Sequence, residues 1–284
     1  MTRPVPPDPA EWRPIVEAAL REDLGEAGDV TTNAVVDAGA TALGRIVARE
    51  DGVVAGIDIA LAVFTMVDPS VVTNPFVADG DRVEKATRLA VVEGPARPIL
   101  TAERVSLNLL SHLSGIATLT ARAVEAVAGT GAVVAATRKT LPGLRVLEKY
   151  AVACGGGWPH RFGLYDAVLI KDNHIGVVGS VTRAVESARA ALGAVPIEVE
   201  VDSLDGLVEA LDAGAETILL DNMGPSSLAE AVAIAAGRAR LEASGGITLE
   251  TLSAVAATGV DVVSMGWLTH SAPSMDVGLD FEGG

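Results

Sequence analysis

Cysteine is almost absent from this sequence, with Cys154 the only one in 284 residues. A single cysteine excludes an intrachain disulfide framework and a cysteine-based zinc site. Aromatic residues make up only 3% of the chain, whereas hydrophobic residues make up 49%. The core must therefore consist of Ala, Val, Leu and Ile, a composition that suits helices layered on parallel strands better than an aromatic-rich β-sandwich.

Positive charge and long apolar runs are also scarce. The formal net charge is −16, from 21 Lys and Arg against 37 Asp and Glu, which argues against a protein that binds nucleic acid or an anionic membrane. No run reaches the roughly 18 apolar residues of a membrane span, and the first residues, MTRPVPPDPAEW, contain no apolar signal core. We therefore expect a cytoplasmic protein that partners neither nucleic acid nor membrane.

The few basic residues gather in one part of the chain. Between residues 138 and 174, six cations face three acids; the cations are Arg138, Lys139, Arg145, Lys149, Arg161 and Lys171. Ion pairing on a solvated face is the common explanation of such a cluster, and an anion-binding site is the alternative.

The first hundred residues show a mixed pattern. The sequence predicts helices over 10–24 and 56–67, a hairpin over 43–56 that turns at Glu50–Gly52, a turn and a strand over 79–96, and one or two helices over 101–128.

A different rhythm begins near residue 132. Apolar strands are predicted at 132–137, 167–170, 197–201, 217–220, 241–244 and 260–265, with helical patterns between the later ones. Strands about 20–30 residues apart with intervening helices indicate βα units and a parallel sheet. A closed barrel of this kind has about eight units, so six predict an incomplete, open α/β barrel. We expect an N-terminal α/β sandwich-like domain over 1–115, to which residues 270–284 return, and the barrel over 116–269.

Almost every predicted barrel strand ends in a charge or a glycine. In parallel α/β folds the carboxyl ends of the strands carry the functional groups. These ends hold Arg138, Lys139, Lys171, Glu200, Asp221, Ser244, Gly245, Gly246 and Gly266. The cations suit carboxylates or phosphates, the two acids suit sugar hydroxyls or Mg²⁺, and the glycines suit a phosphate. The set indicates a substrate with a phosphorylated sugar, a metal-bound diphosphate and a further anion.

Five segments resemble the quinolinate phosphoribosyltransferase family. They are EDLGEAGDVTT (22–32), ERVSLNLLSHLSGIAT (103–118), the long block ATRKTLPGLRVLEKYAVACGGGWPHRFGLYDAVLIKDNHI (136–175), EVEVDSLDGLVEALDAGAETILLDNM (198–223) and EASGGI (242–247). The resemblance implies transfer of phosphoribosyl from phosphoribosyl pyrophosphate to quinolinate, which gives nicotinate mononucleotide, pyrophosphate and CO2, with Mg²⁺, in NAD biosynthesis. It also implies a homodimer or higher homo-oligomer.

Residue roles follow from the same resemblance. The quinolinate carboxylates would be held by Arg104, Arg138, His160, Arg161 and Lys171. Lys139 would face phosphoribosyl pyrophosphate, Glu200 and Asp221 would take ribose hydroxyls and Mg²⁺, and Ser244, Gly245, Gly246 and Gly266 would take a phosphate. Catalytic roles would fall to Lys139, Lys171, Glu200 and Asp221. Arg104 would reach the site of a neighbouring subunit.

Three alternatives stay open at this point. Lys171 on a barrel strand also suits a Schiff-base aldolase, and a related phosphoribosyltransferase-like protein would use another substrate. Residues 80–94 resemble the hairpin of a lipoyl or biotinyl carrier domain, although Lys85 lies away from the hairpin tip.

Four further residues receive provisional roles. We expect the glycines after Cys154 to shape a loop rather than to support a nucleophile, and His112 to pack in a helix or at an interface. His174 suits strand-end packing and site support equally, and Asp29 suits a helix cap.

Overall fold

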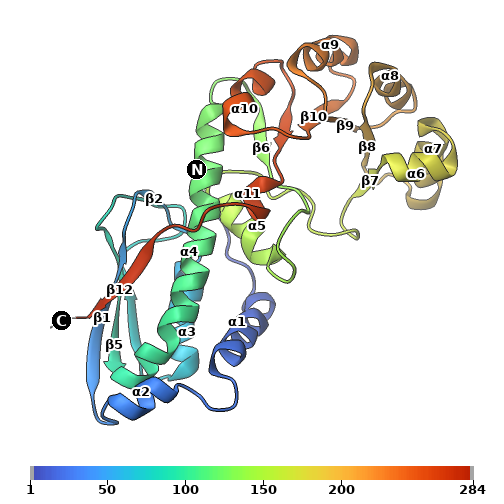
Figure 1. Ribbon diagram of the computed structural model, residues 1–284. Coiled ribbons are helices and arrows are strands. Elements are labelled where there is room, and N and C mark those ends of the chain that lie inside the picture. The colour runs from blue at the N-terminus through green and yellow to red at the C-terminus, as the bar shows by residue number, and fades with distance from the viewer. Residues whose placement is uncertain (1–2, 282–284) are drawn as a thin grey trace. The chain divides into compact units, whose positions relative to one another are not determined.

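The chain forms two units in the computed structural model, which describes residues 3–281 (Figure 1). The first contains residues up to Ala121, 140–156 and residues from Leu268 onward, and the second contains Arg122–Lys139 and Gly157–Trp267. The sequence predicted boundaries of 1–115 with 270–284, and of 116–269; in the structure residues 140–156 belong to the first unit.

A four-stranded antiparallel sheet is the framework of the first unit. Its strands are β1 (Thr41–Ala48), β3 (Val72–Pro75), β5 (Arg88–Pro95) and β12 (Val277–Phe281), in the order β12-β1-β5-β3. The C-terminal strand therefore returns to the first unit, the return that the sequence indicated. The helices of this unit are α1 (Pro9–Leu24), α2 (Val30–Val35), α3 (Ile57–Val67), most of α4 (Ala96–Ala126) and α5 (Arg145–Cys154).

The hairpin expected over 43–56 is wrong. Strand β1 ends at Ala48 and pairs with β5 and β12, whereas the short β2 (Gly52–Val53) pairs with β4 (Arg82–Val83). Both edges of β1 are occupied by strands distant in sequence. The tight turn therefore leads into another sheet rather than back along β1.

Polar contacts attach helix α5 to the first unit. The Tyr150 hydroxyl donates to Asp79 at 2.6 Å, and His112 Nε2 lies 2.9 Å from Glu148 Oε1. Gly155 also lies so close to α4 that a Cβ there would come 2.4 Å from the Ala117 carbonyl oxygen. Residues 140–156 therefore belong to the first unit although the chain on both sides of them belongs to the second, so one boundary in the sequence cannot separate the two units.

Six parallel strands form the second unit. They are β6 (Val133–Ala135), β7 (Val168–Ile170), β8 (Ile197–Val201), β9 (Thr217–Asp221), β10 (Arg240–Ser244) and β11 (Val262–Ser264), in the order β6-β11-β10-β9-β8-β7. Helices α6 (Asp172–Val178), α7 (Val181–Leu192), α8 (Leu204–Asp212), α9 (Pro225–Ala235) and α10 (Leu249–Ala256) connect them, and Figure 1 shows α7 to α10 along the outer side of the strands. All six predicted strands are present.

The barrel is open between its first two strands. In a closed barrel β6 would pair with β7, but here the segment around Trp158 pairs with the edge of β6 that β11 leaves open. Trp158 N–H donates to the Val134 carbonyl at 2.8 Å, and Ala136 N–H donates to the Trp158 carbonyl at 3.0 Å. The expected incomplete α/β barrel is thereby confirmed.

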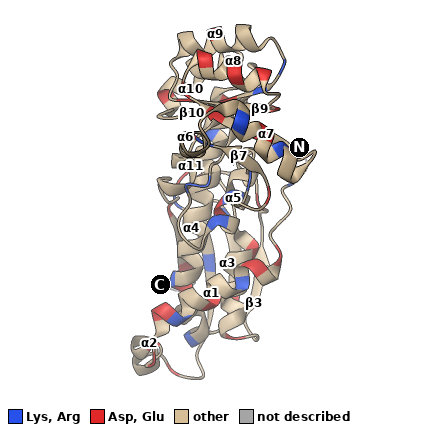
Figure 2. Cartoon of the chain, turned by 90° about the vertical axis from the view of Figure 1, so that its right-hand side faces the viewer, with Lys and Arg blue, Asp and Glu red and all other residues tan. Residues whose placement is uncertain are grey.

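The negative charge lies on outer helices as well as in the site. Helix α8 carries Asp205, Glu209 and Asp212, and acidic residues colour it in Figure 2. Within residues 3–281, no helix combines the length and apolar character that a membrane crossing would need.

Candidate active site

A cavity of about 500 Å³ opens at the carboxyl ends of the barrel strands. Predicted site residues in its lining are Arg138, Lys139, His160, Arg161, Lys171, Glu200, Asp221, Ser244, Gly245 and Gly246. They come from six places in the chain. Five follow or end strands that share one edge of the sheet, and the sixth, His160–Arg161, follows the segment that pairs with β6 at Trp158. All of them belong to the second unit.

Strand alternation directs acids to the inside of the barrel. In β8, Glu198 and Glu200 are two residues apart and share the face opposite to Val199, which is fully buried. In β10, Glu242 and Ser244 share a face in the same way. Each strand therefore places one polar group at its end and a second one deeper in the barrel.

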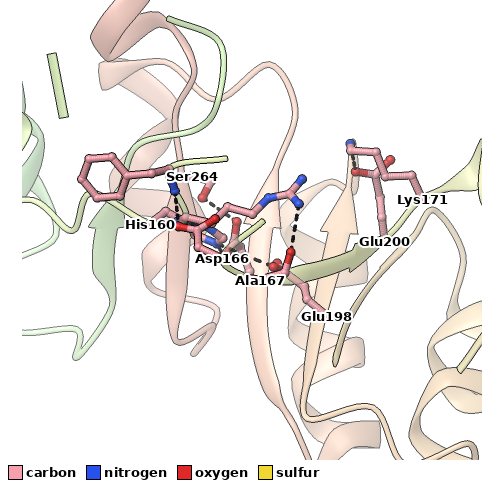
Figure 3. A network of polar contacts seen from close by, with 10 residues as sticks. His160, Asp166, Ala167, Lys171, Glu198, Glu200 and Ser264 are labelled. Carbon is pink, nitrogen blue, oxygen red and sulfur yellow. Dashed lines mark hydrogen bonds and ion pairs between the residues drawn. The ribbon is translucent and has the colours of Figure 1, made fainter. Parts of the chain in front are cut away.

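Lys171 and Glu200 form an ion pair at the mouth of the cavity (Figure 3). The Lys171 side chain is 43% exposed and that of Glu200 is 14% exposed. Lys171 also begins a helix, since its backbone N–H donates to His174 Nδ1 at 2.9 Å. His174 thus supports the segment that carries Lys171, one of its two expected roles.

Arg161 is a partly buried cation in the lining of the cavity. Burial is the main cause that lowers the pKa of its guanidinium, and the neighbouring Arg138 lowers it further, whereas Glu198, Asp166 and Glu200 oppose the change. The guanidinium remains charged at neutral pH because the reference pKa of Arg is so high. Two partly buried guanidinium groups near one cavity favour an anion that lies between them.

The loop after β10 is shaped for close approach of a ligand. Gly245 and Gly246 have positive φ values of 96° and 61°. A Cβ at Gly245 would lie 2.3 Å from Asn222 Oδ1 and 2.8 Å from the Asn222 nitrogen. Glycine is therefore required at 245. The phosphate contact implied for this loop stays a prediction.

A second polar group lies deeper in the barrel, around His160 (Figure 3). His160 Nε2 is 3.1 Å from Glu242 Oε2 and 3.7 Å from Glu198 Oε2. Ser264 Oγ donates to the other oxygen of Glu242 at 2.5 Å. His160, Glu198 and Glu242 also border a smaller cavity of about 320 Å³, which is lined by residues at the N-terminal ends of strands β7 to β10.

Burial raises the pKa of the Glu198 carboxyl group. Desolvation, and then the nearby Glu242 carboxylate, raise the pKa of Glu198 to about 7, although His160 and Arg161 pull it down. Its Oε1 is buried without a hydrogen-bond partner. The other buried acid, Glu242, instead accepts hydrogen bonds from His160 and Ser264.

His160, Glu198 and Glu242 also have the spacing of a metal site, with ligand atoms within 4.8 Å of one another. The tautomer of His160 argues against a metal ion bound at these three residues. Arg161 N–H donates to His160 Nδ1 at 2.7 Å, so the ring proton lies on Nε2 and no lone pair there faces the carboxylates. Glu200 and Asp221, with oxygen ligands at the cavity mouth, suit Mg²⁺ better.

Two predicted site residues are not in the lining of the large cavity. Arg104 belongs to α4 in the first unit; its side chain is 64% exposed and lies 3.8 Å from Glu103. Gly266 follows β11, where Ser264 lines the cavity instead.

The provisional structural roles agree with the structure. Asp29 caps α2 by accepting from Thr32 N–H at 2.8 Å. His112 pairs with the buried Glu148. Cys154 is buried, and burial raises the pKa of its thiol to about 12, which makes it a poor nucleophile.

Sequence reasoning missed the deeper residues Glu198, Glu242 and Ser264. The sequence does contain a pattern that predicts the two acids. In IEVEV Glu198 stands two residues before Glu200, and in RLEAS Glu242 stands two residues before Ser244. The period of two places both on one face. An acid in the middle of a strand that is otherwise apolar is a candidate for a barrel interior.

An open parallel barrel with a cation-rich cavity at its strand ends is the architecture of an α/β-barrel enzyme. Models of the quinolinate phosphoribosyl transferase C-terminal and N-terminal domains match residues 116–280 and 29–114. The chain belongs to the quinolinate phosphoribosyltransferase family.

Individual relatives cover nearly the whole chain. A nicotinate-nucleotide pyrophosphorylase [carboxylating] of Mycobacterium leprae is 49% identical over 94% of this chain and 96% of that protein. A probable nicotinate-nucleotide pyrophosphorylase [carboxylating] of Bacillus subtilis is 44% identical over 91% and 89%. The structure of the Francisella tularensis nicotinate-nucleotide pyrophosphorylase aligns with a TM-score of 0.93 at 36% identity and covers 97% of this chain and 98% of that one.

Proposed function

We propose that this enzyme transfers the phosphoribosyl group of phosphoribosyl pyrophosphate to quinolinate and releases pyrophosphate and CO2. The observation that carries the proposal is the convergence of Arg138, Lys139, Arg161 and Lys171 on one cavity with Glu200 and Asp221. Four cations exceed what a single carboxylate needs, whereas quinolinate has two carboxylates and its partner substrate carries phosphates. The product would be nicotinate mononucleotide, a precursor of NAD.

The chemistry follows from the charges. The pyridine nitrogen attacks the anomeric carbon of ribose as pyrophosphate leaves, and the transition state has positive charge on the sugar. Glu200 and Asp221 tolerate that charge, and Lys139 stabilises the departing diphosphate. The quaternised ring then accepts the electron pair of the carbon–carbon bond to the adjacent carboxylate, which leaves as CO2, and the ring carbon takes up a proton.

Glu200 and Asp221 would hold Mg²⁺, whose preference for oxygen ligands they meet. When bound, Mg²⁺ supplies positive charge to the diphosphate. Lys171 would exchange its contact with Glu200 for a substrate carboxylate. That exchange would leave Glu200 available for the ribose and the metal.

The alternatives from the sequence have less support. An ion-paired lysine is not the neutral amine that a Schiff base requires, and an aldolase does not explain the arginines. The carrier-domain reading needs a hairpin, but β4 pairs with β2, whereas β5 pairs with β1 and β3.

We propose that Arg104 completes the site from a partner subunit of a homodimer or larger assembly. Its exposed side chain lies on α4, in the first unit. The ion pair that it forms with the neighbouring Glu103 is long, at 3.8 Å. An exposed cation of this kind is free to meet an anion bound to another copy of the chain.

Substitutions should separate binding from turnover. Arg161→Ala and Lys171→Ala should weaken quinolinate binding about tenfold or more, because each removes a charged partner of a carboxylate. Glu200→Ala and Asp221→Ala should instead lower kcat, because ribose and metal charges change in the transition state. Isothermal titration with quinolinate and steady-state kinetics measure the two effects. Unchanged quinolinate affinity in both cation variants would contradict the proposed roles.

A further inference from the structure

The His160 side chain has both of its ring nitrogens engaged within the chain. Arg161 N–H donates to Nδ1 at 2.7 Å, which requires Nδ1 to lack a proton. Nε2 therefore carries the proton and donates it to Glu242 Oε2 at 3.1 Å. The ring also lies against Trp158, with centroids 4.5 Å apart. A neutral ring with these contacts has no N–H left for a substrate carboxylate.

The buried Glu242 carboxylate accepts the hydrogen bond from His160. It is 2% exposed and sits in the middle of β10. One of its oxygens accepts from His160 and the other accepts from Ser264 on β11. A buried carboxylate that accepts two hydrogen bonds from separate segments holds both of them in place.

The backbone at His160 explains why such an anchor is needed. Its φ is 55°, an uncommon conformation for a residue with a side chain. The ring folds back onto the next N–H, and the following residue is Arg161, whose guanidinium lines the large cavity. The turn that the imidazole stabilises therefore carries Arg161, whose Nη1 donates to the Ala167 carbonyl at 3.4 Å.

We propose that Glu242 is a positioning residue for the reaction: it fixes the tautomer and orientation of His160, which in turn aims Arg161 at a carboxylate of the substrate. His160 then contributes through Arg161 rather than by its own contact with the carboxylate. The inference rests on the proposed function, since its kinetic test uses quinolinate.

Kinetics of Glu242 variants test the inference. Glu242→Leu keeps a similar volume but removes the acceptor, so the KM for quinolinate should rise about tenfold or more while the KM for phosphoribosyl pyrophosphate changes less than about twofold. Glu242→Gln retains an acceptor for His160 and should stay within about threefold of wild type. An equal rise in both variants would show that charge rather than position matters, and would overturn the inference.

A double variant separates positioning from a general loss of structure. If Glu242 acts through Arg161, then Glu242→Leu should add less than about twofold to the quinolinate KM of Arg161→Ala. A full additional effect would overturn the inference. The matched control is Glu148→Leu, which breaks another buried Glu–His pair; it should lower Tm and leave the quinolinate KM within about twofold. A control effect as large as that of Glu242→Leu would also overturn it.

The tautomer can be observed directly, without turnover. The chain has only four histidines, so ¹⁵N-histidine NMR with His160→Gln as the assignment control can resolve this ring. We expect an unprotonated Nδ1 and a protonated Nε2, both before and after quinolinate is added. A doubly protonated ring in the quinolinate complex would mean direct contact and would overturn the inference. A wild type that binds quinolinate but does not turn it over would instead refute the proposed function.

Discussion

Mixing two inactive variants, Arg104→Ala and Lys171→Ala, should restore activity. Each substitution removes the charged partner of a carboxylate, and each alone leaves every site of a homodimer defective. In a mixed dimer one site has both defects and the other has neither, provided that Arg104 serves the neighbouring subunit. Random pairing makes about half of the dimers mixed, so recovered activity should approach roughly one quarter of wild type by symmetry.

Subunit exchange has to be shown independently in this experiment. Native mass spectrometry of isotopically labelled and unlabelled variants reports the fraction of mixed dimers. A matched control mixes Arg161→Ala with Lys171→Ala, two residues that line the same cavity of one chain. That mixture should stay inactive. Exchange of Arg104→Ala and Lys171→Ala without recovery would mean that Arg104 acts in its own subunit or has no role in the site.

Quinolinate should be preferred strongly over nicotinate as the acceptor. A site built for two carboxylates leaves partly buried guanidinium groups unpaired when one carboxylate is missing, and burial already disfavours the charge on Arg161. A charged hydrogen-bond partner is worth about 1.5–3 kcal/mol, which corresponds to roughly 10- to 150-fold discrimination for each lost contact. The ratio of kcat/KM for the two acids measures this preference, and a ratio near one would contradict the assignment of the cations.

The barrel was predictable because its signals are local. Runs such as IEVEV and TILL are strand-like by themselves, and their spacing with helices implies a parallel sheet. The hairpin over 43–56 failed because pairing is not local: the partners of β1 are β5 and β12, and the latter lies more than 200 residues away. Turn residues at Glu50–Gly52 mark a change of direction but do not specify the strand that follows.

The candidate site was predictable at its rim and not in its interior. Residues such as Lys171 and Asp221 stand at the carboxyl ends of strands, and parallel topology alone brings strand ends together. Glu242 lies in the middle of β10, and its hydrogen bond with Ser264 joins it to the neighbouring β11, a pairing that the sequence does not state. The raised pKa of Glu198 likewise depends on burial and on a second carboxylate, which only the three-dimensional arrangement supplies.

Release of labelled CO2 tests the proposed function most directly. Quinolinate labelled with ¹³C in the carboxylate next to the ring nitrogen is incubated with the protein, phosphoribosyl pyrophosphate and Mg²⁺. We expect one labelled CO2 and one pyrophosphate for each nicotinate mononucleotide formed, with no product when EDTA removes the metal. Label retained in the nucleotide, or no nucleotide at all, would contradict the proposed function.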